Sequence, residues 1–82
     1  MSVRVLFFSV LRDLVGAEEL ALSLDATAPR VADAVTTLYT RYPDLEKWDE
    51  SLLVAVNCEY ADREHLLQEG DEVAFMPPVQ GG

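Results

Sequence analysis

The sequence predicts an α+β fold, in which a mixed sheet of four to five strands is covered on one face by one main helix. Apolar segments with strand character stand at residues 3–8, 18–24, 52–56 and 72–76. One amphipathic helical pattern separates the second of these segments from the third, and turn-forming residues lie between the segments. The chain has 82 residues, which is the length of one small domain.

The first predicted elements are a strand, a short helix and a second strand. Residues 3–8 are rich in β-branched and aromatic side chains and almost wholly apolar, which is typical of a central strand. Apolar residues within 11–15 then stand at helical spacing, and Gly16 follows where a C-terminal helix cap is expected. Residues 18–24 alternate with a period of two, which predicts a half-buried strand paired with the first.

The main helix is predicted to begin near Pro29, because proline is well accepted in the first helical turn. Apolar residues at i, i+4, i+7, i+8 and i+11 form one stripe over residues 31–42, and Pro43 is expected to end the helix. A polar connection at residues 44–49 leads to the third strand, residues 52–56.

The last part of the chain completes the sheet. Residues 59–69 fit either a short strand or a helical turn, and Gly70-Asp71 predicts a turn before the last strand at 72–76. The resulting order of strands around one main helix is the β-grasp, or ubiquitin-like, arrangement. We expect a β-grasp domain over residues 1–76 and a projecting C-terminal tail over residues 77–82.

The charge of the chain restricts its partners. Six basic side chains stand against fifteen acidic ones, which gives a net charge of −9. Binding to a nucleic-acid backbone needs clustered lysine and arginine, so we expect no nucleic-acid partner. An acidic surface is instead attracted to a basic surface on another protein, unless the charge serves only solubility.

The cysteine content and the N-terminal residues indicate where in the cell the protein is located. Cys58 is the only cysteine, so no disulfide can form within the chain and a reducing compartment is expected. The apolar run at residues 5–8 is too short for a signal peptide or a membrane span. We therefore predict a cytoplasmic protein without membrane contact.

No catalytic or metal-binding constellation stands out in the sequence. Cys58 and the only histidine, His65, lack neighbours at metal-ligand spacing, so no metal site is predicted. A lone cysteine at a strand end is typically an inert, small hydrophobic residue. The carboxylates stand at turns and strand ends, which is typical of a solvated surface. We expect the chain to be inactive on its own.

The six C-terminal residues carry the predicted chemistry, and they read Pro77-Pro78-Val79-Gln80-Gly81-Gly82. Adjacent prolines hold the backbone near polyproline geometry, which projects the tail from the sheet. Glycine has no Cβ, so a Gly-Gly end can enter a narrow channel. A terminal carboxylate is a poor electrophile until ATP converts it into an acyl-adenylate, after which its acyl group can pass to sulfur or nitrogen.

Strand parity predicts a docking surface beside this tail. Alternation along the first and last strands turns Phe8 and Met76 away from the helix, and Tyr60 joins them if its segment is a strand. Aromatic and methionine side chains are common anchors in protein interfaces. Arg12, on the short helix, is a further candidate for contact with an acidic group of a partner. The alternative is that a loop of the same domain covers Phe8 and Met76.

Five segments of the chain together form a pattern known from one protein family, namely residues 5–8, 12–16, 54–57, 70–75 (Gly-Asp-Glu-Val-Ala-Phe) and 77–82. In these segments the sequence resembles the small sulfur-carrier subunit of molybdopterin synthase. The resemblance implies that an activating enzyme using ATP and Mg²⁺ adenylates Gly82, and that a sulfur-donating enzyme supports its conversion to a thiocarboxylate. It further implies that residues 77–81 thread the active site of the large subunit, and that sulfur passes to cyclic pyranopterin monophosphate to build the dithiolene of the molybdenum cofactor.

The same resemblance implies a heterotetramer with a dimer of large subunits at its centre, and no cofactor bound by this chain. The departure from the family pattern is Cys58, where relatives often have glutamine. Three other functions stay open: a thiamine-pathway sulfur carrier, a protein modifier that forms an amide with a target lysine, and a β-grasp binding domain with an incidental tail.

Overall fold

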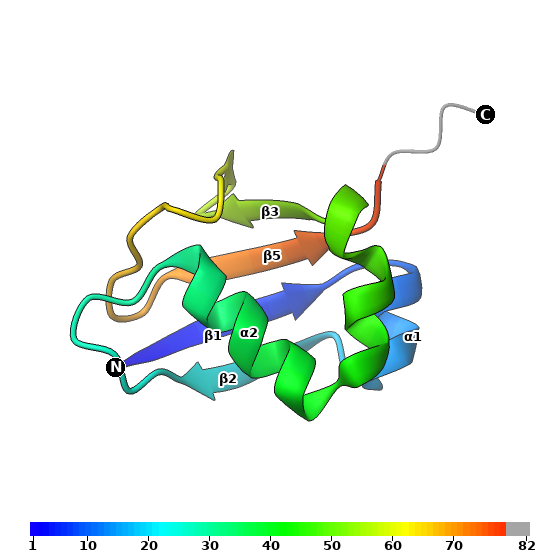
Figure 1. Ribbon diagram of the computed structural model, residues 1–82, viewed down its shortest axis with the longest axis horizontal. Helices are drawn as coiled ribbons and strands as arrows, with labels where there is room; N and C mark the ends of the chain where they lie inside the picture. Colours follow the sequence, from blue (N-terminus) through cyan, green and yellow to red (C-terminus); the bar gives the residue numbers. More distant parts are fainter. Residues whose placement is uncertain (79–82) are drawn as a thin grey trace.

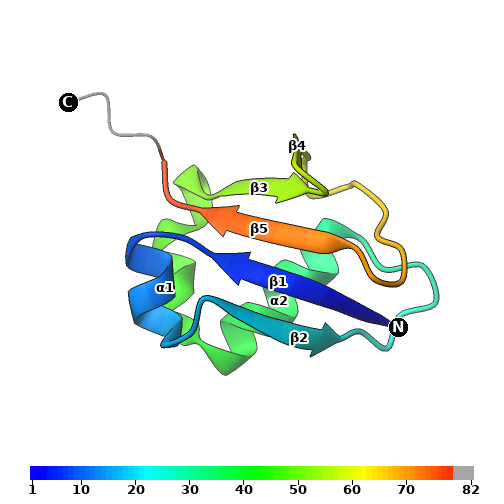
Figure 2. The same cartoon turned by 180° about the vertical axis from the view of Figure 1, so that it is seen from behind.

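The computed structural model describes residues 1–78, which form one sheet covered on one face by helices (Figure 1). The elements in chain order are β1 (Ser2–Phe7), α1 (Val10–Val15), β2 (Glu19–Ser23), α2 (Val31–Arg41), the 3₁₀ helix η1 (Pro43–Ser51), β3 (Leu53–Val56), β4 (Glu59–Tyr60) and β5 (Glu72–Met76). The strand order is β2-β1-β5-β3-β4, and Figure 2 shows the face of this sheet that the helices leave open. The predicted β-grasp architecture is confirmed.

β1 lies inside the sheet, between β2 and β5, which explains why four of its six residues are apolar. It pairs antiparallel with β2 and parallel with β5, so the sheet is mixed as predicted. The parallel register sets Val5 beside Val73 and Phe7 beside Phe75, and all four side chains are at most 2% exposed. The two phenylalanine rings meet edge to face, with centroids 6.1 Å apart.

α2 covers the inner face of the sheet with its apolar stripe. Its buried residues are Val31, Ala34, Val35 and Leu38, of which the stripe predicted all but the alanine. Burial of each large side chain contributes about 1.5–3 kcal/mol to the transfer free energy that favours folding. The short helix α1 ends at Gly16 as predicted, because Gly16 has φ 85° and its N–H donates to the carbonyl of Arg12 at 2.8 Å.

The start of α2 differs from the prediction, because Pro29 precedes the helix and does not lie in its first turn. Arg30 is the N-cap residue, and its N–H donates to a carboxylate oxygen of Asp33 at 2.7 Å. The N–H groups of Val31 and Ala32 donate to the carbonyls of His65 and Arg63, both at 2.9 Å. A loop distant in sequence therefore satisfies donors that an isolated helix would leave unpaired.

Two segments between the main predicted elements form regular structure that the sequence analysis did not assign. The predicted polar connection at residues 44–49 is instead part of η1, which begins at Pro43 and buries Leu45 to 1% exposure. Proline suits this position because its fixed φ is helical and the first N–H of a helix needs no internal partner. In the ambiguous stretch 59–69, Glu59–Tyr60 forms the short strand β4.

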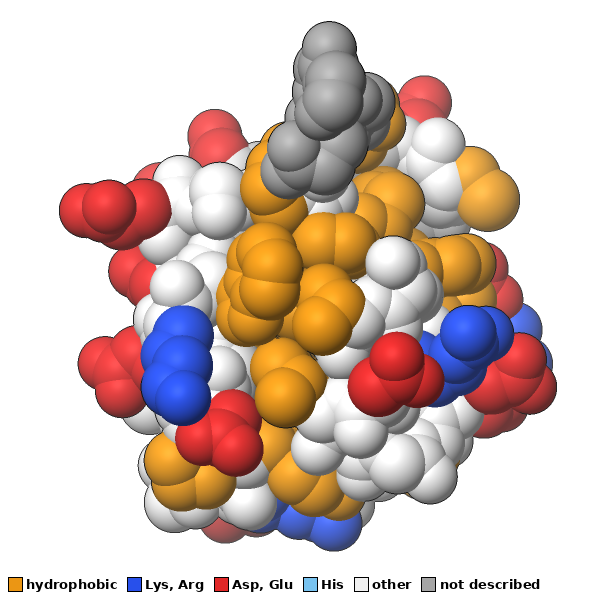
Figure 3. Space-filling view, turned by 90° about the vertical axis from the view of Figure 1, so that its right-hand side faces the viewer, with side chains coloured by type: hydrophobic (Ala, Val, Ile, Leu, Met, Phe, Trp, Pro, Cys, Tyr) orange, Lys and Arg blue, Asp and Glu red, His pale blue; other side chains and the backbone are white. Residues whose placement is uncertain are grey.

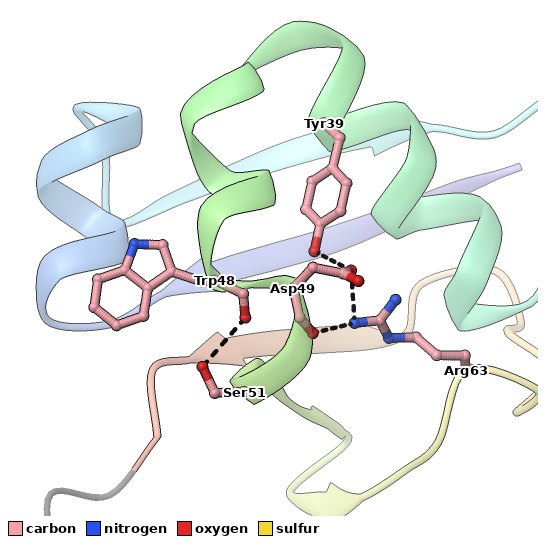
Figure 4. A network of polar contacts seen from close by, with 5 residues as sticks. All are labelled: Tyr39, Trp48, Asp49, Ser51 and Arg63. Atoms are coloured by element: carbon pink, nitrogen blue, oxygen red, sulfur yellow. Dashed lines mark hydrogen bonds and ion pairs between the residues drawn. The ribbon is translucent and has the colours of Figure 1, made fainter.

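A polar network joins α2, η1 and the loop after β4 (Figure 4). The hydroxyl of Tyr39 donates to Oδ1 of Asp49 at 2.7 Å. The Arg63 guanidinium donates to the same oxygen and to the carbonyl of Asp49, both at 3.1 Å. These hydrogen bonds, first from Tyr39 and then from Arg63, lower the pKa of Asp49, whereas burial and the Asp49 carboxylate raise the pKa of Tyr39 to about 12.

The lowered pKa of Asp49 predicts a contribution to acid sensitivity. Because the folded-state pKa lies below the unfolded value, the Asp49 carboxylate stabilises the fold above about pH 4, and this stabilisation is lost as the pH falls through the folded-state pKa. Asp49→Asn should therefore lower the unfolding free energy at pH 7 and flatten its decline between about pH 5 and about pH 2. The measurement is urea unfolding at a series of pH values.

The matched control for this experiment is Glu50→Gln, which removes a carboxylate from the neighbouring, exposed position of η1. The control leaves the hydrogen bonds of Asp49 with Tyr39 and Arg63 in place, so its unfolding free energy at pH 7 should stay close to the parent's. Equal slopes for Asp49→Asn and the parent protein would show that the network does not hold a charged Asp49.

Candidate functional site

The base of the predicted tail lies at one end of the sheet. β5 ends at Met76, followed by Pro77 and Pro78, both half-buried. The predicted reactive residue Gly82 and the predicted threading residues Val79, Gln80 and Gly81 lie outside the described residues. The structure therefore places the start of the tail, and the division at residue 76 into domain and tail stays a prediction.

Phe8 lies beside the base of the tail because β1 and β5 are parallel. Their C-terminal ends meet at the same end of the sheet, and the N–H of Phe8 donates to the carbonyl of Phe75 at 3.2 Å. Phe8 is 45% exposed, so the alternative that a loop of the same domain covers it is wrong. Met76 is half-buried on the neighbouring strand.

Figure 2 shows the open face of the sheet, and the strand registers place residues in rows across this face. One row crosses the four strands β1, β5, β3 and β4 and consists of Leu6, Ala74, Ala55 and Tyr60. The next row, nearer the tail, contains Phe8, Met76 and Leu53. The structure thus brings Phe8, Met76 and Tyr60 to one face, as strand parity predicted.

An apolar hollow of about 310 Å³ lies on this face. We call it the docking hollow, and its lining residues are Leu6, Phe8, Ala55, Cys58, Tyr60, Glu72, Ala74 and Met76. The two alanines lie opposite each other on β3 and β5, so the larger side chains around them stand higher and form the walls. In Figure 3 hydrophobic side chains gather beside the point where the described chain ends.

A polar row bounds the docking hollow on the side away from the tail. Arg4 lies opposite Glu72 and forms an ion pair with it, and the Arg4 guanidinium is also 3.9 Å from Glu19. The hydrogen bond and the charge of Glu72 raise the pKa of Arg4. Exposed pairs of this kind contribute little to stability, because solvent screens the two charges. Their effect here is to confine the apolar part of the face to the end that carries the tail.

Arg12 lies on the other side of Phe8. It shares a second, more polar hollow of about 280 Å³ with Phe8 and Glu18, and its guanidinium is 3.6 Å from the Glu18 carboxylate. All four residues predicted to bind a partner, namely Phe8, Met76, Tyr60 and Arg12, therefore line one of two adjoining hollows. Their part in binding stays a prediction.

The sequence reasoning did not identify the alanine floor of the docking hollow. Strand parity places Ala74 and Ala55 on the open face, but their adjacency follows only from the pairing of β3 with β5. Cys58 also differs from the expectation of a small hydrophobic residue, because it is exposed in the β3–β4 turn with φ 74°. His65 is exposed, and its carbonyl accepts the N–H of Val31.

Within residues 1–78, no group of three histidine, cysteine, aspartate or glutamate side chains is arranged to hold a metal ion. No helix in the same part of the chain has the length and apolar character needed to cross a membrane.

Comparison with known proteins identifies the family. The molybdopterin synthase sulfur carrier subunits of Escherichia coli and Haemophilus influenzae are 38% and 39% identical to this chain, and both alignments cover 98% of this chain and 99% of the relative. The crystal structure of small archaeal modifier protein 1 from Haloferax volcanii, 29% identical, superposes with a TM-score of 0.87 over the full length of both chains. The ThiS family model matches residues 5–82. The chain therefore belongs to the ThiS family, among the molybdopterin synthase sulfur carrier subunits.

Proposed function

We propose that this protein is the sulfur carrier subunit of a molybdopterin synthase and that Gly82 bears the transferred sulfur. The observation that carries the proposal is the docking hollow beside the base of a tail that ends in Gly-Gly. The near full-length similarity to carriers of this name supports the same function. Gly82 is then a substrate of partner enzymes, and the catalytic groups belong to those partners.

The loading chemistry follows from the terminal carboxylate. An activating enzyme that uses ATP and Mg²⁺ joins the Gly82 carboxylate to AMP and releases pyrophosphate, which makes the carbonyl carbon electrophilic. A sulfur-donating enzyme then supplies sulfur at the oxidation level of sulfide, which attacks this carbon and displaces AMP, so that one carboxylate oxygen leaves with AMP and a thiocarboxylate remains. A persulfide donor gives the same product when a thiol then reduces the acyl disulfide and forms a new disulfide with the donor. In the synthase, this sulfur passes to cyclic pyranopterin monophosphate, where it becomes part of the dithiolene. This chain itself binds no cofactor in the proposed cycle.

The docking hollow is proposed to hold the large subunit while the tail enters that subunit's active site. Phe8, Met76 and Tyr60 would be the anchors, with Arg12 as a polar contact at the edge. The six tail residues 77–82 span at most about 20 Å when fully extended. The active site of a partner that covers the docking hollow therefore lies within that distance of Met76. Residues 77–81 thread this active site. The expected assembly is a heterotetramer with a dimer of large subunits at its centre.

Protein modification is the second candidate function, and one observation favours it. The similar crystal structure from Haloferax volcanii carries the name of a small archaeal modifier protein. A modifier would use the same activated carboxylate but pass it to a lysine amine, which forms an amide bond. The two functions share the activation step and differ in the acceptor.

Intact mass spectrometry of the protein from cells that contain its activating enzyme tests the loading step. The expected result is a species in which sulfur replaces one oxygen at the C-terminus, and deletion of Gly82 should abolish both this species and formation of the molybdenum cofactor. Leu66→Asp is a control, because it changes an exposed residue away from the tail and should load normally. Covalent conjugates in place of the sulfur species would favour the modifier, and a truncated chain that still supports cofactor formation would contradict the proposal.

Docking is tested with Phe8→Asp combined with Met76→Asp. Central apolar anchors typically contribute about 2 kcal/mol or more each, which is roughly 30-fold in affinity for one anchor, so the double variant should weaken binding to the large subunit by up to about 1,000-fold. Titration calorimetry measures the affinity, and circular dichroism verifies the fold. Leu66→Asp adds a charge to another exposed hydrophobic residue and should bind like the parent. Unchanged affinity in the folded double variant would show that the docking hollow is not the interface.

A further inference from the structure

The turn between β3 and β4 has an unusual backbone conformation. Asn57 and Cys58 both have positive φ, at 50° and 74°. Two successive positive φ values are typical of the two-residue hairpin turn that matches the twist of paired strands. Asparagine adopts this conformation more readily than most residues, but residues other than glycine rarely adopt it without support.

The side chain of Asn57 supplies this support. The backbone N–H of Asn57 donates to the carbonyl of Glu72 at 2.8 Å, and the side-chain Oδ1 of Asn57 accepts the N–H of Glu72 at 3.0 Å. The side-chain oxygen thus takes the place of the main-chain acceptor that a regular strand residue would offer. The β3–β5 pairing consequently continues one residue beyond the end of β3.

The same amide also fixes the turn that precedes β5. Its Nδ2 donates to Oδ1 of Asp71 at 2.9 Å, while Oδ2 of Asp71 accepts the N–H of Gln68 at 2.8 Å. One side chain therefore connects the β3–β4 turn to the first residue of β5 and to the turn before it. Each polar group of the Asn57 amide has a partner in this arrangement.

The position of Tyr60 depends on this turn. β4 has two residues and is the outermost strand, where Tyr60 pairs with Ala55 of β3. The N–H of Ala61 donates to the carbonyl of Val54 at 2.9 Å, which holds the far side of the strand. The Tyr60 side chain is 75% exposed, so packing constrains it little although it forms one wall of the docking hollow.

We propose that Asn57 is a positioning residue for partner docking, because its side chain holds the turn that sets Tyr60 at the wall of the docking hollow. Asn57 is not among the residues that line the hollow, so its effect on binding passes through Tyr60. The proposal rests on the proposed function, in which the docking hollow receives the large subunit. It adds Asn57, a residue outside the docking hollow, to the determinants of affinity.

The test is a double-mutant cycle on binding to the large subunit. Asn57→Gly removes the side-chain hydrogen bonds without adding strain, because glycine accepts positive φ. Tyr60→Ala should weaken binding about tenfold or more, and Asn57→Gly should weaken it several-fold. If Asn57 acts through Tyr60, the double variant should bind within about twofold of Tyr60→Ala alone, since residues acting through one contact are not additive.

A partner-free measurement complements the cycle. Ala55 and Tyr60 are directly opposed on β3 and β4, which brings their Cβ atoms to about 4.5–5.5 Å. Nuclear Overhauser contacts between the Tyr60 ring and the Ala55 methyl should be present in the parent protein and weak or lost in Asn57→Gly. Contacts unchanged in Asn57→Gly would overturn the positioning role whatever the binding results.

The control is Asp33→Ala, which removes the carboxylate that accepts the Arg30 N–H at the start of α2, on the opposite face of the sheet. It lowers stability through a lost helix cap and should bind the large subunit like the parent. Equal weakening by Asp33→Ala would mean that Asn57 acts through general stability. Parent-like binding by Tyr60→Ala would show that Tyr60 is not a docking residue. Parent-like binding by Asn57→Gly would overturn only the positioning role. The positioning role would also be overturned if the losses of affinity of the two single variants multiplied in the double variant.

Discussion

The parallel pairing of β1 with β5 is the contact on which the rest of the structure depends. It joins the first and last strands of the chain, with Phe7 opposite Phe75. Parallel neighbours need a long crossover, and the intervening chain supplies α2, which covers the inner face of the sheet. Because parallel strands end at the same side of a sheet, the same pairing sets Phe8 next to Met76 and the base of the tail.

Side chains along β1 and β5 point alternately to the two faces of the sheet, so residues that stabilise the core alternate with residues that are available for recognition. Val5 and Val73 point toward α2 and are fully buried, whereas their neighbours Leu6 and Ala74 point to the open face. The inward residues determine whether the domain folds, and the outward residues determine the shape of the docking hollow. Substitutions on the open face can therefore alter binding while the core stays intact, so their effect on partner affinity can be measured apart from any effect on stability.

The sequence predicted the features that depend on local pattern. Alternation identified the strands and the open-face residues, and Gly16 marked the end of α1, because backbone geometry alone imposes these preferences. The start of α2 was placed wrongly at Pro29, since its N–H groups are satisfied by carbonyls of a loop more than thirty residues away. The docking hollow was missed in part for the same reason, because its floor forms only when Ala55 and Ala74 come together across two strands.

The net charge of −9 has a physical consequence for a protein with an apolar open face. Exposed side chains such as Phe8 and Tyr60 favour association with any apolar surface, including the same face of a second copy. Two copies of this chain repel each other through their like charge, and this repulsion opposes self-association. A partner with a basic surface meets no such barrier and is attracted at long range. On the proposed function, the acidic surface thus serves both solubility and partner selection, and the two interpretations of the charge do not exclude each other.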